Sequence, residues 1–315
     1  MTSDRPTCMV ETNDRLETGG AMNGQLHVVN LETCTGDGIC AEVCPENALQ
    51  VVDKKAVTVG SRAESCIYCG QCVAVCPTES LQMPQLQTED FRRLENVPIG
   101  FDGFYEFLRS RRSVRAFKDQ PVERETIDKI LSAGATAPMG FPPHTTEVVV
   151  IDNRAELDVL LDELVREYDS MIKAFSSPLG RAFVRLKAGA KDYGVLKNHV
   201  LQNVRFKNER FHRDGTDRYM YGAPVVMIFH GSRSGISHEE NAHLVCHHAM
   251  LAAVSLGLGT TIIGLIPPIV DRSKTLRERF GIPGGSRVVT SLIVGHPRYR
   301  YRQGIRRDLA GVTYI

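Results

Sequence analysis

Seven of the nine cysteines fall between Cys34 and Cys76, and their spacing repeats after 32 residues. The positions that correspond under this shift are Cys34 and Cys66, Asp37 and Cys69, Cys40 and Cys72, Cys44 and Cys76, and Pro45 and Pro77. The match continues in Ala-Leu-Gln and Ser-Leu-Gln, and each half follows a short alternating run, LHVVN or AVTV, that suits a strand. The segment is therefore an internal duplication.

The second half has the spacing C-x2-C-x2-C-x3-C-P, which is typical of bacterial [4Fe-4S] sites. Three close thiolates wrap one cluster, and the cysteine before the proline reaches the neighbouring cluster. We therefore expect the first cluster to be held by Cys66, Cys69, Cys72 and Cys44. Zinc is the main alternative, but a four-cysteine zinc site needs only two Cys-x2-Cys pairs and leaves the longer run unexplained.

The first half departs from this pattern because Asp37 stands where the second cysteine would be. The thiolate ligands that remain are Cys34, Cys40 and the crossing Cys76. A carboxylate is a harder and weaker ligand for iron than a thiolate. We predict either a [4Fe-4S] cluster ligated by Asp37 with a labile iron or a [3Fe-4S] cluster; the simpler alternative makes Asp37 a solvated turn residue. Residues 26–83 resemble the bacterial two-cluster ferredoxins, which implies one-electron transfer.

The bulk composition places few limits on the partners of the chain. At 315 residues, two unequal domains are expected, and a formal net charge of +1 gives no general attraction to nucleic acid or anionic membranes. The first residues lack an apolar export signal, and the apolar stretch 249–266 is interrupted by serine and glycine. We predict a cytoplasmic protein with no nucleic-acid or membrane partner.

The pattern of residues along the chain predicts four regions. They are a flexible leader (1–25), a two-cluster ferredoxin-like domain (26–83), a linker (84–103) and a larger domain (104–315). In the larger domain we expect helices over 104–111, 123–135, 239–256 and much of 155–213, with strands over 147–151, 223–231 and 291–296. Helices mixed with a few buried strands indicate an α+β fold.

A basic run, Arg111-Arg112-Ser113-Val114-Arg115, follows the first of these helices. Guanidinium groups form bidentate hydrogen bonds with phosphate oxygens, and a serine hydroxyl adds a donor. Taken alone, the run fits a solvated basic turn better than a binding site. Its context decides between the two interpretations.

The order and spacing of four segments resemble the nitroreductase family over residues 104–315. The segments are RRSVRAFKDQPV, APMGFPPHTTEVVVI, LAAVSLGLGTTIIG and IVGHPRYRYRQGIRRDL. The resemblance implies a nitroreductase-like α+β domain that binds FMN and forms a homodimer, with each FMN site built from both chains. It assigns the FMN phosphate to Arg111, Arg112, Ser113, Arg115, Arg302 and Arg306. It places near the flavin ring Met139, Gly140, Ile263, Gly264 and Leu265.

The resemblance is imperfect, and other residues have simpler explanations. Many family members have Asn and Gln where this chain has Pro142 and His144, so the polar contacts there are in doubt. Gly257 and Gly259 are expected to cap a helix and to allow tight packing. One predicted helix carries His243, Cys246, His247 and His248, which we interpret as a polar helix flank in preference to a metal site. The basic tail 298–307 is explained by a phosphate without invoking nucleic acid.

Together the two modules predict an FMN-dependent, iron-sulfur flavoprotein oxidoreductase. A one-electron donor such as ferredoxin or flavodoxin, or NAD(P)H, would supply electrons for the two-electron reduction of a small nitro, quinone or enone compound. The alternatives are substrate oxidation with electrons leaving through the clusters, and a non-catalytic relay or redox sensor. No catalytic residue is identified. Candidate proton donors, unranked, are Tyr193, His199, Tyr219 and Tyr221.

Overall fold

The structure is a computed structural model that describes residues 26–86, 91, 93–94, 99–140 and 145–315. It divides into two compact units, residues 1–97 and 98–315. The proposed leader (1–25) with Cys8, much of the proposed linker, and the departures Pro142 and His144 lie outside the described residues.

The smaller unit consists of two like halves that exchange strands. Strand β1 (Val28–Val29) pairs with β4 (Leu81–Gln82), and β2 (Leu49–Val52) pairs with β3 (Lys55–Thr58), both antiparallel. Each pair joins a strand of one half to a strand of the other. The short helices α1 (Ile39–Glu42) and α2 (Gln71–Ala74) occupy equivalent positions, and each follows a glycine, at φ 82° and φ 70°, respectively. Only glycine adopts this left-handed conformation without strain.

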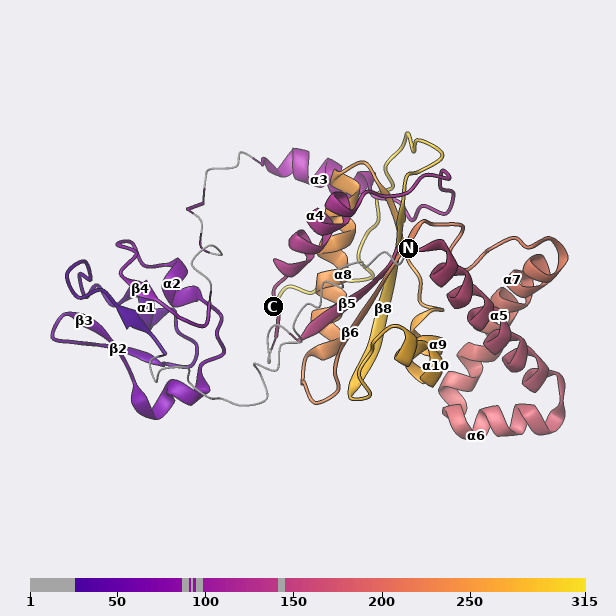
Figure 1. Cartoon of the computed structure of the whole chain (residues 1–315), viewed down its shortest axis with the longest axis horizontal. Coiled ribbons are helices and arrows are strands. Elements are labelled where there is room, and N and C mark those ends of the chain that lie inside the picture. The colour runs from indigo at the N-terminus through magenta and orange to yellow at the C-terminus, as the bar shows by residue number, and fades with distance from the viewer. Residues whose placement is uncertain (1–25, 87–90, 92, 95–98, 141–144) are drawn as a thin grey trace, which may run out of the picture. The chain divides into compact units, whose positions relative to one another are not determined.

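An antiparallel sheet of four strands organises the larger unit (Figure 1). Its order is β5 (Thr146–Ile151), β6 (Val225–Ser232), β8 (Ser286–Gly295) and β7 (Gly259–Ile262). The central strands β6 and β8 are almost entirely buried. Such continuous apolar runs indicate a sheet covered on both faces.

Helices cover both faces of this sheet and form a three-layer α+β sandwich (Figure 1). Helices α4 (Arg124–Ala135) and α8 (His238–Ser255) pack on one face with Met227 and Phe229. Helices α5 (Arg154–Ser176), α9 (Pro267–Arg272) and α10 (Lys274–Arg279) pack on the other with Val226 and Ile228. Because side chains alternate along a strand, β6 contributes to both cores.

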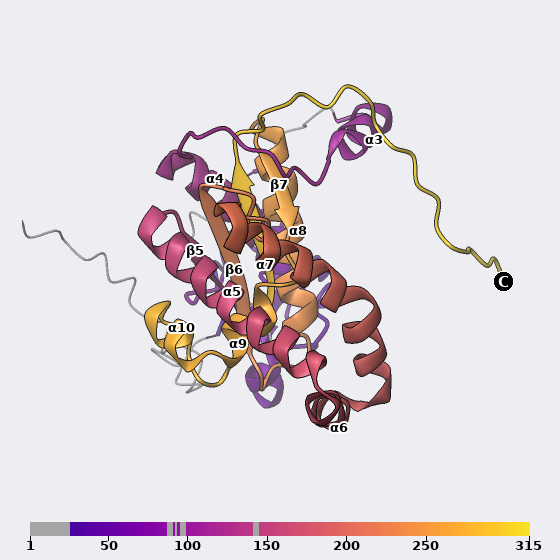
Figure 2. The same ribbon diagram turned by 90° about the vertical axis from the view of Figure 1, so that its right-hand side faces the viewer.

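A helical excursion connects α5 to β6 (Figure 2). It contains α6 (Pro178–Val195), a π-helical turn over Leu196–Val200, and α7 (Leu201–Asp214). Gly189 interrupts α6 with φ 77° and ψ 166°. After β8, the residues from Arg298 to Ile315 are exposed, and this tail runs away from the sheet (Figure 2).

The observed elements confirm the predicted α+β fold class and correct several boundaries. Helix α3 spans Phe101–Ser110 and thus begins before 104, since Phe101 stacks on Tyr105 with ring centroids 5.6 Å apart. Strand β8 begins at Ser286, five residues before the predicted start at 291. Strand β7 and helices α9 and α10 were not predicted, because at 4, 6 and 6 residues they are too short to show a periodic pattern. No helix among the described residues is long and apolar enough to cross a bilayer.

Candidate functional site

Two recesses in the smaller unit divide the predicted cluster ligands into two sets. The first recess is lined by four cysteines together with His27 and Met83; the cysteines are Cys44, Cys66, Cys69 and Cys72. The second recess is lined by Cys34, Asp37, Cys40 and Cys76. In each set one cysteine comes from the opposite half of the duplication. The exchange of strands explains this crossing, because it brings the end of each half beside the recess of the other.

The spacing of these side chains distinguishes a cluster site from a zinc site. Tetrahedral zinc requires sulfur atoms about 3.8 Å apart, given Zn–S bonds of about 2.3 Å. Among the described residues, no three His, Cys, Asp or Glu side chains are close enough to share one metal ion. The cysteines from Cys34 to Cys76 are all free thiols. Separated thiols around a recess fit a multi-iron cluster better than a single ion.

Local hydrogen bonds hold the sulfur atoms of the two crossing cysteines in place. The Ala48 amide donates to Cys44 Sγ at 3.2 Å, and the Ser80 amide donates to Cys76 Sγ at 3.3 Å. Burial alone would raise the pKa of Cys76, but hydrogen bonds from Thr78 and Ser80 lower it overall. Burial raises the pKa of Cys72 to about 12, so this thiol loses its proton only when a metal replaces it.

The loop around Asp37 holds its carboxylate in place at the second recess. Thr35 Oγ1 donates to Asp37 Oδ2 at 2.8 Å, and the Ile39 amide donates to Oδ1 at 3.1 Å. These hydrogen bonds, that from Thr35 first, lower the pKa of Asp37. Lys55 Nζ fastens the same loop by donating to the Cys34 carbonyl at 2.7 Å. The carboxylate is thus ionised and exposed. It lines the second recess at the position that Cys69 occupies in the first.

In the larger unit, the basic run 111–115 lies along the edge strand of the sheet. Ser113 bridges Thr260 in parallel, and the Val114 amide donates to the Thr260 carbonyl at 2.9 Å. Gly259 makes this approach possible, because a Cβ atom there would lie 2.7 Å from the Val114 side chain. The preceding Gly257, at φ 79°, follows the end of α8 and caps it. Both glycine roles agree with the sequence prediction.

The arginines of this run lack anionic partners. Among the described residues, no carboxylate forms an ion pair with Arg111, Arg112 or Arg115. Partial burial, followed by the charges of Arg112 and Arg307, lowers the pKa of Arg111. The buried Nε of Arg112 has no hydrogen-bond partner. A cluster of like charges with an unsatisfied donor fits a phosphate group such as that of FMN.

Two neighbours of Arg111 were not predicted for this site from sequence. Arg307 acts on Arg111 from the tail, whereas the predicted Arg306 is exposed and pairs with Asp308 at 3.3 Å. His247 on α8 is also within electrostatic reach: partial burial, His248 and Arg111 all lower its pKa. The predicted Arg302 is exposed, and among the described residues of a single chain it makes no polar contact with this cluster. The two arginines Arg306 and Arg307 are adjacent in the sequence, and the path of the tail decides which of them lies near Arg111.

The residues predicted near the flavin ring lie on two other segments. Gly140 is clamped by the buried Asn241: its amide donates to Asn241 Oδ1 at 2.7 Å, and its carbonyl accepts from Nδ2 at 3.1 Å. Met139 packs against the core of α4 and α8. Ile263 is buried in the opposite core, and its backbone amide and carbonyl are both hydrogen-bonded to Ser291. Gly264 is exposed, and Leu265 accepts a hydrogen bond from Tyr168 at 2.7 Å.

Comparisons with known proteins agree with this geometry. Residues 108–296 match the nitroreductase family, which is more than half of the chain, and residues 26–77 match the 4Fe-4S dicluster domain. The chain belongs to the nitroreductase family. Membership classes it as an FMN-dependent oxidoreductase, and the second match gives it an iron-sulfur module, as the sequence predicted.

Relatives within and around this family differ in their activities. A putative NADH dehydrogenase/NAD(P)H nitroreductase from Methanothermobacter thermautotrophicus is 34% identical over 61% of this chain and 76% of its own length. An iodotyrosine deiodinase from Hydra vulgaris is 22% identical over 62% of this chain, and the match spans only 65% of that relative. The structure of a nitroreductase with bound FMN from Bacteroides fragilis has a TM-score of 0.50 and 20% identity, and covers 67% of this chain and 97% of that protein.

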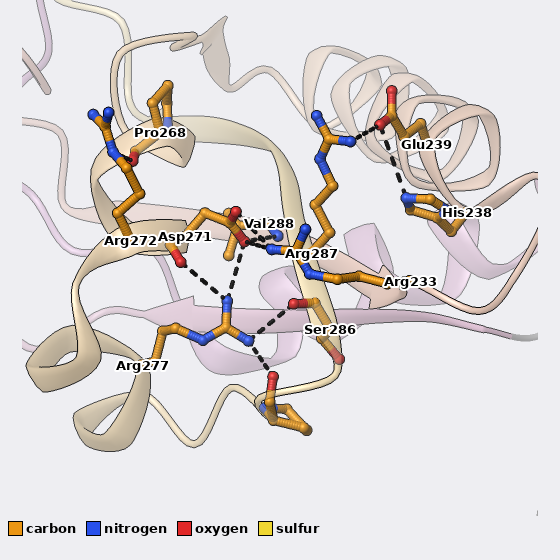
Figure 3. Close-up of polar contacts among 11 residues, drawn as sticks. Arg233, His238, Glu239, Pro268, Asp271, Arg272, Arg277, Ser286, Arg287 and Val288 are labelled. Carbon is orange, nitrogen blue, oxygen red and sulfur yellow. Dashed lines mark hydrogen bonds and ion pairs between the residues drawn. The ribbon is translucent and has the colours of Figure 1, made fainter. Parts of the chain in front are cut away.

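Two further groups of polar residues are explained by structure alone. Cys246 is fully buried in the core beneath α8, whereas His243 and His247 on the same helix are exposed. Asp271 accepts hydrogen bonds from Arg277, Arg233 and the Val288 amide (Figure 3). This ion network fastens α9 and α10 to β8.

Proposed function

We propose that the protein reduces an electrophilic organic compound, of nitro, quinone or enone type, with electrons delivered one at a time through its iron-sulfur module. The observation that carries this proposal is the presence of a dicluster domain and a nitroreductase domain in one chain. When bound, the clusters supply one-electron storage, and FMN supplies the conversion between one-electron and two-electron chemistry.

The two recesses support a specific division of cluster ligands. We infer that Cys44, Cys66, Cys69 and Cys72 hold a [4Fe-4S] cluster. In the second recess, Asp37 would serve as the fourth ligand of a labile [4Fe-4S] cluster, or leave a [3Fe-4S] cluster held by the three cysteines. The position of Asp37 in the recess beside Cys40 and Cys76 supports a ligand role, whereas its hydrogen bonds with Thr35 and Ile39 are those of a local turn.

The basic run supports a phosphate role for Arg111, Arg112, Ser113 and Arg115. Arg307 joins them from the tail as an additional candidate. We retain Arg302 and Arg306 as candidates for a site completed by a second chain, in a homodimer, because neither reaches the cluster within one chain. The ring would lie near Met139, Gly140 and the backbone of 263–265.

Tyr221 is the best placed of the four candidate proton donors. Its hydroxyl lies 3.3 Å from the buried Lys207 Nζ, and its ring lies 6.0 Å from the guanidinium of Arg115. Tyr221 also has φ 59°, which is a strained value for this residue type. Strained residues cluster at functional sites. Tyr221 is thus half-buried and held beside Lys207.

The other three candidates are less suited to donate a proton. Tyr219 is buried, its hydroxyl donates to Asn208 Oδ1 at 2.5 Å, and burial raises its pKa. Tyr193 stacks on Phe175 with ring centroids 5.6 Å apart. His199 lies in the exposed π-helical turn. Among the residues that the structure describes, none of these three makes a hydrogen bond, ion pair or ring contact with the basic run.

Anaerobic rapid mixing tests the direction of electron flow. The reconstituted protein is mixed with reduced ferredoxin and, separately, with NADPH, while flavin absorbance is followed. Rapid bleaching by ferredoxin and slow bleaching by NADPH is the expected result. The NAD(P)H nitroreductase relative makes direct reduction by NADPH the second candidate, and fast bleaching by NADPH alone would reject the inward route.

A further inference from the structure

Helix α6 presents its apolar side chains to solvent. Leu179, Phe183 and Leu186 are 85%, 57% and 84% exposed, respectively, and their i, i+4, i+7 spacing places them on one face of the helix. The residues on the side facing the domain, Val184 and Ala188, are small and half-buried. No residue of α6 is buried. This is the reverse of an ordinary surface helix, whose apolar face covers the core.

Cationic side chains lie beside and behind this apolar face. At 100° per residue, Lys187 lies about 70° from the middle of the stripe formed by Leu179, Phe183 and Leu186, whereas Arg185 lies about 130° from it on the other side. Lys187 Nζ lies 5.1 Å from the centre of the Phe183 ring. From residue 178 to residue 191 the sequence contains four basic and no acidic residues. The charge of this surface is therefore uniformly positive.

The position of α6 leaves the face accessible within its unit. Helix α6 is the first element of the helical excursion and lies away from the sheet (Figure 2). Arg181 anchors the inner side by donating to the Phe175 carbonyl at 3.1 Å. Gly189 ends the first helical stretch, so the apolar face is confined to residues 178–188. A short amphipathic surface thus faces outward.

We propose that this face of α6 docks on an anionic phospholipid surface. Leucine and phenylalanine side chains on such a helix enter the boundary between headgroups and acyl chains, while flanking cations contact acidic headgroups. The charge complementarity selects an anionic over a neutral membrane. The sequence prediction of no membrane partner relied on net charge and hydropathy, both of which average over the chain and miss an 11-residue surface helix.

A single tryptophan provides a direct test, because the chain has none. In the holoenzyme, Phe183→Trp is expected to shift its emission to the blue when vesicles of phosphatidylcholine and phosphatidylglycerol are added, and not with phosphatidylcholine alone. The control is Ile236→Trp, since Ile236 is 83% exposed but lies in the loop before α8. Its emission should not change with either type of vesicle.

Charge and apolar contributions are separated by two further variants. The double substitution Arg185→Gln and Lys187→Gln should weaken vesicle partitioning about thirtyfold, since each surface cation contributes to it. The matched control is Lys129→Gln with Lys274→Gln, two exposed lysines elsewhere, which should leave partitioning unchanged. Leu179→Ser with Leu186→Ser should abolish binding.

Three outcomes would overturn the proposal. The first is an unchanged Phe183→Trp emission with anionic vesicles, and the second is an equal shift in the Ile236→Trp control. The third is a blue shift that grows with protein concentration in the absence of vesicles, which would make the occupant of this face a second copy of the chain.

Discussion

Asp37 and Cys69 occupy equivalent positions in the two halves of the iron-sulfur module, and each lines its own recess. The loops around them have the same form, with a left-handed glycine, Gly38 or Gly70, leading into a short helix. At these equivalent positions one recess has a carboxylate and the other a thiol. This single difference makes the two sites chemically unequal.

Asp37→Cys should therefore convert the second site into a full four-cysteine site. We expect the variant to retain about eight irons per chain after exposure to air, while the wild type loses iron and gains a 3Fe signal by low-temperature EPR. Glu42→Cys, which adds a thiol to the same half outside the recess, should behave as wild type. A wild type that holds all its iron in air, with no 3Fe signal, would defeat the labile-iron prediction.

Arg112→Gln should weaken FMN binding about 10- to 150-fold, the value of one charge-assisted hydrogen bond of about 1.5–3 kcal/mol. The reason is the buried Nε of Arg112, which has no hydrogen-bond partner among the described residues, in a cluster without carboxylates. The dissociation constant is measured by titrating the apoprotein with FMN and following flavin fluorescence. Lys274→Gln removes an exposed cation from the same unit and should leave this constant unchanged; an equal effect in both variants would count against a local phosphate site.

Gly259→Ala should lower the free energy of unfolding by about 1–3 kcal/mol through overpacking against Val114. Because Val114 is part of the basic run, the variant should also retain less FMN. Gly284→Ala, where an added methyl group meets nothing within 4 Å, serves as the matched control. Denaturant unfolding measures stability, and FMN content after gel filtration measures retention. Normal retention in a destabilised Gly259→Ala would separate the run from the flavin.

His230 should make the larger unit less stable as the pH falls. Burial, opposed by Glu147 and reinforced by Arg277, lowers the pKa of His230 below the ordinary value of 6.5. As the pH falls through 6.5, the unfolded chain takes up a proton that folded His230 does not, so the stability decreases. His230→Gln should reduce this loss between about pH 7.5 and about pH 5.5, measured by urea unfolding. The exposed His243→Gln is the control and should keep the wild-type slope.

Tyr221→Phe and Tyr219→Phe should have opposite consequences. Removing the Tyr221 hydroxyl should lower kcat about 10²- to 10⁴-fold if it protonates the substrate, with little loss of stability. Removing the buried Tyr219 hydroxyl should cost about 1–3 kcal/mol of stability, because Asn208 Oδ1 loses its donor, with little effect on kcat. Steady-state kinetics and denaturant unfolding of both variants test this. An unchanged kcat in Tyr221→Phe would point to solvent as the proton source.

The sequence alone determined the chemistry that depends on spacing along the chain. The duplicated cysteines, the crossing of the fourth ligand and the position of Asp37 follow from short motifs. Because these ligands lie on local turns, their grouping needs few long-range contacts. The α+β class and the longer helices and strands were also predictable, since their periodicity extends over several turns.

The tertiary structure decided whatever depends on contacts between distant segments. Strand β7 is too short to have a pattern of its own, yet it anchors the basic run through Thr260. The path of the chain decides that Arg307, and not Arg306, lies near Arg111. It also brings Lys207 beside Tyr221. The outward apolar face of α6 is likewise invisible to periodicity, which gives the face of a helix but not the side on which the core lies.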